Sequence, residues 1–183
     1  MKLKHIMLDL ETFDNGSNSL VCALGAVRFD PRTGELGETF YRVPLDMRNQ
    51  QTKYGRTVNV DTVLFWMEQE KAARDAILRP GSEAHVPTLQ MLSEFQEFVG
   101  VGGTYVWGNG TSFDNTILRN LYEGAGLIAP WRYENDMCYH TVKTLAMSRS
   151  PTWLVRGTVK HNALEDAIFQ ANQLAEFYKC VSL

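Results

Sequence analysis

The sequence predicts an α/β fold in which a mixed sheet is flanked by helices. Three apolar runs with strand character come first, and helical patterns alternate with a short strand after them. This order of elements is typical of a mixed sheet covered by helices. A length of 183 residues and a hydrophobic content of 44% fit one domain with a substantial core, so we expect a single domain over 1–183.

The first three strands are expected to form an antiparallel meander. HIMLDL at 5–10 and the apolar run at 20–30 have strand character, and a return strand follows at 36–45. Pro31 and Gly34 predict the turn before the return strand. The polar segment at 47–59 shows neither a helical nor a strand period, so we expect a loop there.

Helical patterns follow this meander. Asp61 is the expected cap of a helix over 63–78, and Thr88 is the expected cap of a second helix over 89–100, with a loop at 79–87 between them.

A short central strand at 104–109 then precedes three helices. They are expected at 112–126, ending at Gly124 or Gly126, at 136–147, and from Asn162 to about Lys179, with a loop at 148–161. Asn162 and Glu165 form a pair that resembles a capping box at the start of the last helix.

The composition excludes several classes of protein. No apolar run approaches the roughly 20 residues needed to cross a bilayer, so we expect no membrane partner. The net charge of −3 argues against broad electrostatic coating of nucleic acid, although a nuclease that uses metals and a few local cations would tolerate it. Cys22, Cys138 and Cys180 lack CxxC spacing, which predicts a reducing, cytoplasmic setting without disulfides or structural zinc.

Four acidic residues lie at three distant points, in or beside apolar runs. These are Asp9 and Glu11 in IMLDLET, Asp114 in WGNGTSFDN and Asp166 in HNALEDA. Residues two apart on a strand share a face, so Asp9 and Glu11 project together. If folding brings these carboxylates together, they repel one another by an energy on the order of several kcal/mol. Bound divalent cations would offset this repulsion, and Mg²⁺ prefers such oxygen ligands. The pattern therefore predicts a metal site suited to phosphoryl chemistry.

Each motif alone also has a simpler interpretation. The D-x-E pair would suit a solvated strand end, and Asp114 would suit the first turn of a helix because of the helix dipole. His161 and Asp166 are more specific as a pair. An acid beside the buried stripe of the last helix needs a partner, and His161 lies just outside that helix.

Taken together, the motifs resemble a known family. DLET at 9–12, NGTSFDN at 109–115 and HNALEDA at 161–167 are similar to the three exonuclease motifs of the DEDD superfamily, in its DEDDh branch. The segment at 62–78 resembles the region between the first two motifs in phage- and bacterial-type 3′–5′ exonucleases and exoribonucleases. Asp136, another acid in an apolar context, lies outside the motifs and receives no chemical role.

The resemblance implies a ribonuclease-H-like fold and a metal-dependent 3′–5′ exonuclease that releases nucleoside 5′-monophosphates from single-stranded RNA or DNA. It implies two Mg²⁺ ions about 3.5–4 Å apart, for which Mn²⁺ can substitute. Asp9 would bridge both ions, Glu11 and Asp166 would hold the ion that carries the attacking water, and Asp114 would act mainly through metal-bound water. His161, with an imidazole pKa near roughly 6.5, would be the general base.

The expected contacts with substrate depend on less specific signals. The resemblance implies that Leu10 and Thr12 pack against the terminal nucleotide. Phe13 would stack on the terminal base or else belong to the core. Arg156 and Lys160 would meet backbone phosphates or else be solvated loop residues.

Other functions and an assembly also fit parts of the pattern. DLET superficially resembles the motif of magnesium-dependent phosphatases with an aspartyl nucleophile, but Glu11 stands at the third position where they have aspartate. A non-catalytic nucleic-acid-binding module with this fold would be expected to have lost one or more of the acids. Many relatives pair as dimers, and apolar faces around Trp66, itself a core or interface residue, would allow a homodimer.

Overall fold

The structure is a computed structural model that describes residues 3–78, 83–155 and 161–181. A six-stranded sheet in the order β4-β3-β2-β1-β5-β6 organises these residues, with the short strand β4 (His85–Val86) at one edge. On one side, β1 (His5–Thr12), β2 (Val21–Phe29) and β3 (Leu36–Pro44) pair antiparallel in sequence order. On the other side of β1, β5 (Tyr105–Gly108) and β6 (Asp136–Cys138) pair parallel. The predicted mixed sheet, antiparallel first and parallel later, is confirmed.

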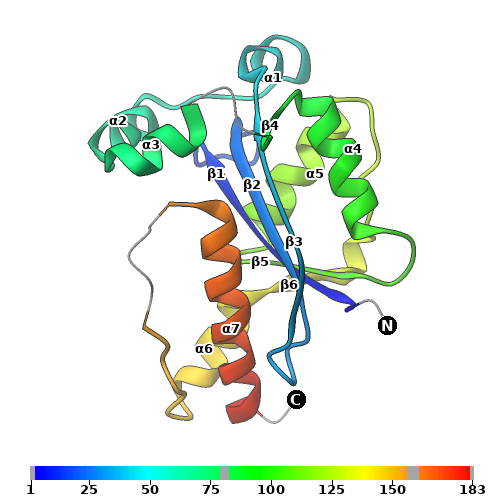
Figure 1. The fold of residues 1–183 in the computed structure, drawn as a ribbon, viewed down its shortest axis with the longest axis vertical. Coiled ribbons are helices and arrows are strands. Elements are labelled where there is room, and N and C mark those ends of the chain that lie inside the picture. Colours follow the sequence, from blue (N-terminus) through cyan, green and yellow to red (C-terminus); the bar gives the residue numbers. More distant parts are fainter. Residues whose placement is uncertain (1–2, 79–82, 156–160, 182–183) are drawn as a thin grey trace.

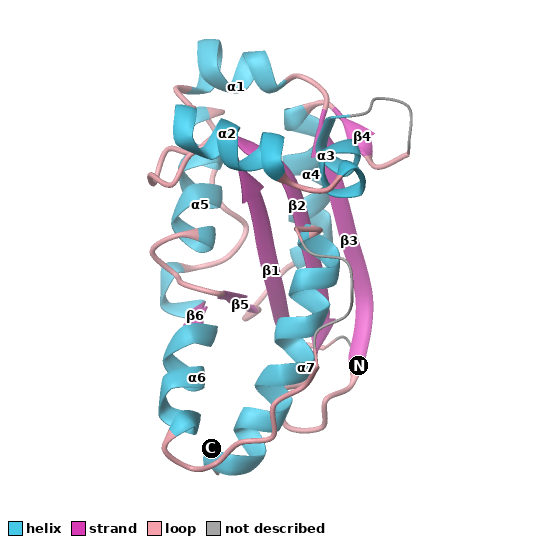
Figure 2. Ribbon diagram, turned by 90° about the vertical axis from the view of Figure 1, so that its left-hand side faces the viewer, coloured by secondary structure: helices cyan, strands magenta, loops and turns pink. Residues whose placement is uncertain are grey.

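Helices cover both faces of this sheet (Figures 1 and 2). The helices α4 (Thr88–Val99) and α5 (Asp114–Gly124) pack on one face, and α6 (Tyr139–Met147) and α7 (Ala163–Val181) pack on the other. The β1 side chains alternate between these layers, because Leu8 and Leu10 belong to the core cluster with α4 and α5, whereas Met7 belongs to the cluster with α7. By the same alternation, Asp9 and Glu11 lie on the α7 side.

A close approach between β2 and α7 positions the last helix. A Cβ atom on Gly25 would lie 2.2 Å from both the carbonyl carbon of Ala163 and the amide nitrogen of Leu164, so only glycine allows this contact. The first turn of α7 is thereby held directly against the strand that pairs with β1. This packing brings Asp166, in that first turn, next to the acids of β1.

The prediction of a loop at 47–59 is wrong, because α1 (Met47–Tyr54) forms there. Its stability comes from contacts distant in sequence. The buried Gln50 side chain accepts a hydrogen bond from the Val21 amide at 3.0 Å and donates one to the Val21 carbonyl at 2.8 Å. Asp46, just before α1, accepts bonds from the amide and the hydroxyl of Thr88. Thr88 therefore does not cap α4, whose N-cap residue is Pro87.

The single helix expected over 63–78 is also wrong. Two helices occupy this region, α2 (Val60–Glu68) and α3 (Lys71–Leu78), because Gln69 adopts an extended backbone between them. Asn59, rather than Asp61, caps α2: its side-chain oxygen accepts a hydrogen bond from the Asp61 amide at 2.7 Å.

Two short strands occur where none was expected. Residues of the expected loop at 79–87 include β4 (His85–Val86), which pairs parallel with β3. The helix expected at 136–147 begins only at Tyr139, because 136–138 form β6 against β5. A single 3₁₀ turn, η1 (Tyr133–Asn135), precedes β6. At α7 the predicted capping role of Asn162 is confirmed, since its side chain accepts hydrogen bonds from the amides of Leu164 and Glu165.

Among the described residues, no helix combines the length and the apolar character that crossing a bilayer requires.

Candidate active site at the carboxyl end of strand β1

Three carboxylates from β1 and α7 lie together. One oxygen each from Asp9, Glu11 and Asp166 lies within 4.8 Å of the other two, with Glu11 and Asp166 buried and Asp9 half-buried. At an effective dielectric constant of about 20, two unit charges 5 Å apart repel by about 3 kcal/mol. The cluster is therefore unfavourable when fully ionised and strongly attractive to a cation.

Asp114 approaches the same strand end from the opposite layer. It is the first residue of α5, and its carboxylate accepts hydrogen bonds from the amides of Leu10 at 3.3 Å and Asn109 at 3.0 Å. Gly108 makes this approach possible, because a Cβ atom there would lie 2.9 Å from the Cβ atom of Asp114. Asp114 is not one of the three clustered acids, but it lines a cavity together with Asp9.

Burial raises the pKa of Asp114 to about 6, although the amide groups of Gly110, Leu10 and Asn109 donate to the carboxylate and lower its pKa. Folded protein then binds this proton more tightly than unfolded chain. In EDTA, the resulting stabilisation should be present below about pH 4 and be lost as the pH rises through about 6. Two pKa units correspond to about 3 kcal/mol of unfolding free energy.

This pH dependence can be measured against Asp114→Asn, which cannot ionise. Denaturant unfolding in EDTA at pH 4 and pH 7 should show a steeper decline in the unfolding free energy for the wild type than for the variant. Parallel declines in the two proteins would show that Asp114 does not titrate as its burial implies.

Gln170 orients one of the clustered acids. Its side-chain amide donates a 2.7 Å hydrogen bond to Oδ1 of Asp9. Gln170 lies one helical turn after Asp166 on α7, so both side chains face β1. The sequence prediction missed this residue, although its spacing from Asp166 was a usable signal.

His161 stands at the entrance of α7 in a strained conformation. Its φ of +60° lies in the left-handed region, which costs a non-glycine residue on the order of 1–3 kcal/mol and tends to persist at functional sites. Its ring packs edge-on against Phe65 and Trp66, with centroid separations of 5.2 and 5.9 Å. These contacts hold the imidazole between α2 and the start of α7.

A cavity of about 340 Å³ lies on the Glu11 side of the cluster, and we call it the Glu11 cavity. Its apolar walls come mainly from Leu10, Phe65, Trp66 and Phe113. Its polar lining consists of Glu11, Thr12, Asn15, Asp61 and Thr62. Its size and its mixed lining suit a small organic group with polar edges, such as a nucleoside.

A second cavity, of about 380 Å³, lies on the Asp9 side and is called the Asp9 cavity. Asp9 and Asp114 line it together with the β5–α5 turn, and His140 and Lys143 contribute from α6. Leu10 and Phe113 line both cavities, so the two lie on either side of these residues.

The predicted substrate residues have different positions. Leu10 and Thr12 line the Glu11 cavity. Phe13 packs with the core cluster that includes Trp66, its ring edge-on to that indole, which favours the core interpretation. Trp66 is itself buried and donates from its indole nitrogen to the Thr12 carbonyl at 2.8 Å. Arg156 and Lys160 lie outside the described residues.

Several residues that line these cavities were not predicted from the sequence. Phe65 lies in the segment at 62–78 and Phe113 in the motif at 109–115, but neither phenylalanine was assigned a role from the sequence. His140 and Lys143 lie on α6, three residues apart and therefore on one face of that helix.

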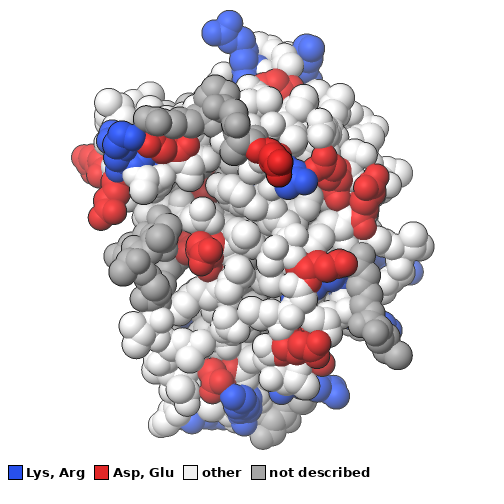
Figure 3. Space-filling view, in the orientation of Figure 1, with Lys and Arg blue, Asp and Glu red and all other residues white. Residues whose placement is uncertain are grey.

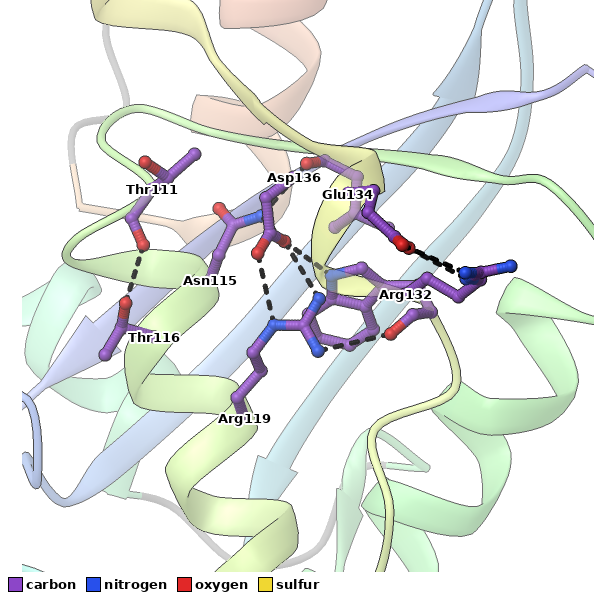
Figure 4. A network of polar contacts seen from close by, with 9 residues as sticks. Thr111, Asn115, Thr116, Arg119, Arg132, Glu134 and Asp136 are labelled. Carbon is purple, nitrogen blue, oxygen red and sulfur yellow. Dashed lines mark hydrogen bonds and ion pairs between the residues drawn. The ribbon is translucent and has the colours of Figure 1, made fainter.

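Asp136 belongs to a structural network rather than to the cluster of acids (Figure 4). Its carboxylate accepts hydrogen bonds from Asn115 at 2.9 Å, from Trp131 at 2.6 Å and from both Nε and an Nη of Arg119 at 3.2 Å. The network joins α5 to β6. Since Asn115 follows Asp114 directly, Asp136 helps to fix the first turn of α5.

Comparison with known proteins identifies the family. The model of the Rv2179c-like 3′–5′ exoribonuclease domain matches residues 4–178. The chain belongs to this family. The nuclease family that the motifs indicate is thereby confirmed. No curated protein sequence matches the chain.

Solved structures show the same fold. The zinc-bound form of Escherichia coli exonuclease I with single-stranded DNA superposes with a TM-score of 0.68 at 14% identity, over 98% of this chain and 41% of that one. Cell-death related nuclease 4 (CRN-4) gives a TM-score of 0.61 at 15% identity, over 97% of this chain and 64% of that one. The chain thus spans about two fifths of the length of exonuclease I and less than two thirds of CRN-4.

The residues of the cluster fit a divalent metal. Three converging carboxylates supply hard oxygen ligands, and their mutual repulsion is relieved by a doubly charged ion.

Proposed function

We propose that residues 1–183 act as a single exonuclease domain that removes nucleoside 5′-monophosphates from the 3′ ends of single-stranded RNA. The observation that carries this proposal is the meeting of Asp9, Glu11 and Asp166 beside two cavities, in a member of an exoribonuclease-domain family. The family description favours RNA. Single-stranded DNA, with which exonuclease I forms its complex, is the alternative substrate.

Asp9, Glu11 and Asp166 would hold two Mg²⁺ ions, for which Mn²⁺ can substitute, with Asp9 shared between them. When bound, such ions stabilise the charge that develops on the attacking and leaving oxygens of an in-line displacement. Gln170 keeps the Asp9 carboxylate oriented through its 2.7 Å hydrogen bond. Asp114 fixes the backbone at Leu10 and at the β5–α5 turn, which sets the distance between the two layers of the site.

His161 would accept the proton of the attacking water. An imidazole suits this step because its pKa is normally close to neutral pH. The contacts with Phe65 and Trp66 restrict the ring to the edge of the Glu11 cavity. The terminal nucleoside would occupy this cavity, with its base against the rings of Phe65 and Phe113, where stacking is worth roughly 1–3 kcal/mol and tolerates any base.

The distribution of charge suits recognition by a few local groups. On the face shown in Figure 3, acidic groups are spread over the surface and basic groups lie mostly toward its edges. With a net charge of −3, affinity for nucleic acid has to come from the metal site, from stacking and from individual cations near the cavities. A homodimer stays a prediction, and Trp66, which is buried within the chain, does not itself offer a contact surface for it.

Polarity is tested with end-labelled RNA oligonucleotides and Mg²⁺. The protein should release mononucleotides from the 3′ end, and a 3′-terminal phosphate should slow digestion because the terminal ribose must enter the Glu11 cavity. EDTA should stop the reaction. Rapid digestion of the blocked oligonucleotide would exclude a 3′–5′ exonuclease, and release of phosphate from p-nitrophenyl phosphate instead of nucleotides would indicate a phosphatase.

A further inference from the structure

The Asp9 cavity contains two basic side chains that the proposed reaction does not use. Lys143 and His140 project from one face of α6 and line this cavity, which Asp9 and Asp114 also line. Lys143 is half-buried, and within the described residues no carboxylate forms an ion pair with it. Its ammonium group lies near the ring of Trp153, whose centroid is 5.8 Å from Nζ. A contact at this distance leaves the ammonium hydrogens able to bind an anion.

The position of α6 relative to the acids is fixed by the backbone. The His140 amide donates a 3.0 Å hydrogen bond to the Asn109 carbonyl, while the Asn109 amide donates a 3.0 Å bond to Asp114. The β5–β6 pairing brings Gly108 opposite Cys138, directly before α6. Lys143 and His140 are therefore held at a set position with respect to Asp9 and Asp114.

The two cavities define a path for the substrate. A 3′–5′ exonuclease cuts between the 3′ oxygen of the penultimate nucleotide and the phosphorus of the terminal one. With the terminal nucleoside in the Glu11 cavity and the scissile phosphate at the acids, the penultimate nucleotide falls on the Asp9 side. The 5′ phosphate of the penultimate nucleotide is the next anion along the substrate strand. It would reach the side of the Asp9 cavity that the Lys143 ammonium and the His140 imidazole line.

We propose that Lys143, assisted by His140, binds the phosphate on the 5′ side of the penultimate nucleotide, so that the enzyme prefers substrates with a second phosphate. This inference rests on the proposed function. A lysine is a suitable ligand because a charged hydrogen bond to phosphate is stronger than a neutral one. Such a contact changes affinity by roughly tenfold or more.

The test compares two dinucleotides that differ only in this phosphate. Wild-type protein should hydrolyse pApA with a KM roughly tenfold below that for ApA. In Lys143→Gln this ratio of KM values should fall toward one, and Lys143→Arg should restore most of it. A trinucleotide, ApApA, should behave like pApA, because its additional phosphodiester occupies the same place.

Lys53→Gln provides the matched control. It removes the same charge from an exposed position on α1, at the opposite end of the molecule from α6 (Figure 1), and should leave the ratio of KM values unchanged. Thermal unfolding of each variant checks that the fold is retained. A wild-type ratio near one, or a ratio that Lys143→Gln leaves intact, would overturn the inference while the exonuclease stands. Failure of wild type to cleave any of the three substrates would overturn both.

Discussion

Asp9→Asn should reduce metal-dependent digestion of RNA by at least about 10³-fold while the fold is retained. Asp9 is the clustered acid that lines the Asp9 cavity, and the proposed mechanism shares it between both ions. Loss of residues that only support a metal ligand already costs about 10–100-fold, so loss of a shared ligand should cost more. The amide is isosteric, and the Gln170 side chain can still donate to its oxygen.

Initial rates with Mg²⁺ and with Mn²⁺ measure this effect. Glu134→Gln is a suitable control, because Glu134 pairs with Arg132 on the surface and the substitution removes the same charge. The control should retain full activity. Near-normal digestion by Asp9→Asn would show that the cluster is not the catalytic centre.

His161→Ala should lower turnover by about 10²–10⁴-fold, the usual contribution of a general base. Asparagine at this position is informative because it tolerates a positive φ better than most residues but cannot act as a base at neutral pH. His161→Asn should therefore be as inactive as His161→Ala. Recovery of activity in the asparagine variant would show that His161 serves to maintain the backbone conformation and does not act as a base.

The two histidine variants should still bind metal. Binding of Mn²⁺, followed by calorimetry, should be largely retained, since the cluster is formed by carboxylates alone. The pH profile offers a second readout. The wild-type rate should fall as the pH drops through the pKa of the base. This fall at low pH should be absent from the pH profile of the residual activity in both variants.

The sequence alone predicted those site residues and elements whose positions are specified by a local pattern. The D-x-E spacing on a strand places Asp9 and Glu11 on one face, and the spacing between His161 and Asp166 places both at the start of α7. Asn162 caps this helix as its residue type suggests. The antiparallel meander was predicted from three apolar runs with strand character and from the turn at Pro31 and Gly34.

Contacts between segments distant in the sequence explain the elements and site residues that were not predicted. Gln50 stabilises α1 by bonding to β2, and no local period announces such a contact. Residues 136–138 form a strand because β5 offers a free edge, and Asp136 is held by three side chains brought together by folding. His140 and Lys143 become candidate substrate residues only because the β5–β6 pairing carries α6 to the edge of the site.

Anomalous diffraction from crystals soaked in Mn²⁺ would show directly whether Asp9, Glu11 and Asp166 bind divalent ions. We expect manganese peaks at bonding distance from oxygens of these three side chains, and we expect these peaks to be lost in crystals of Asp166→Asn. Crystals of protein that digests RNA in Mn²⁺, but with no manganese at these carboxylates, would contradict the proposed metal site.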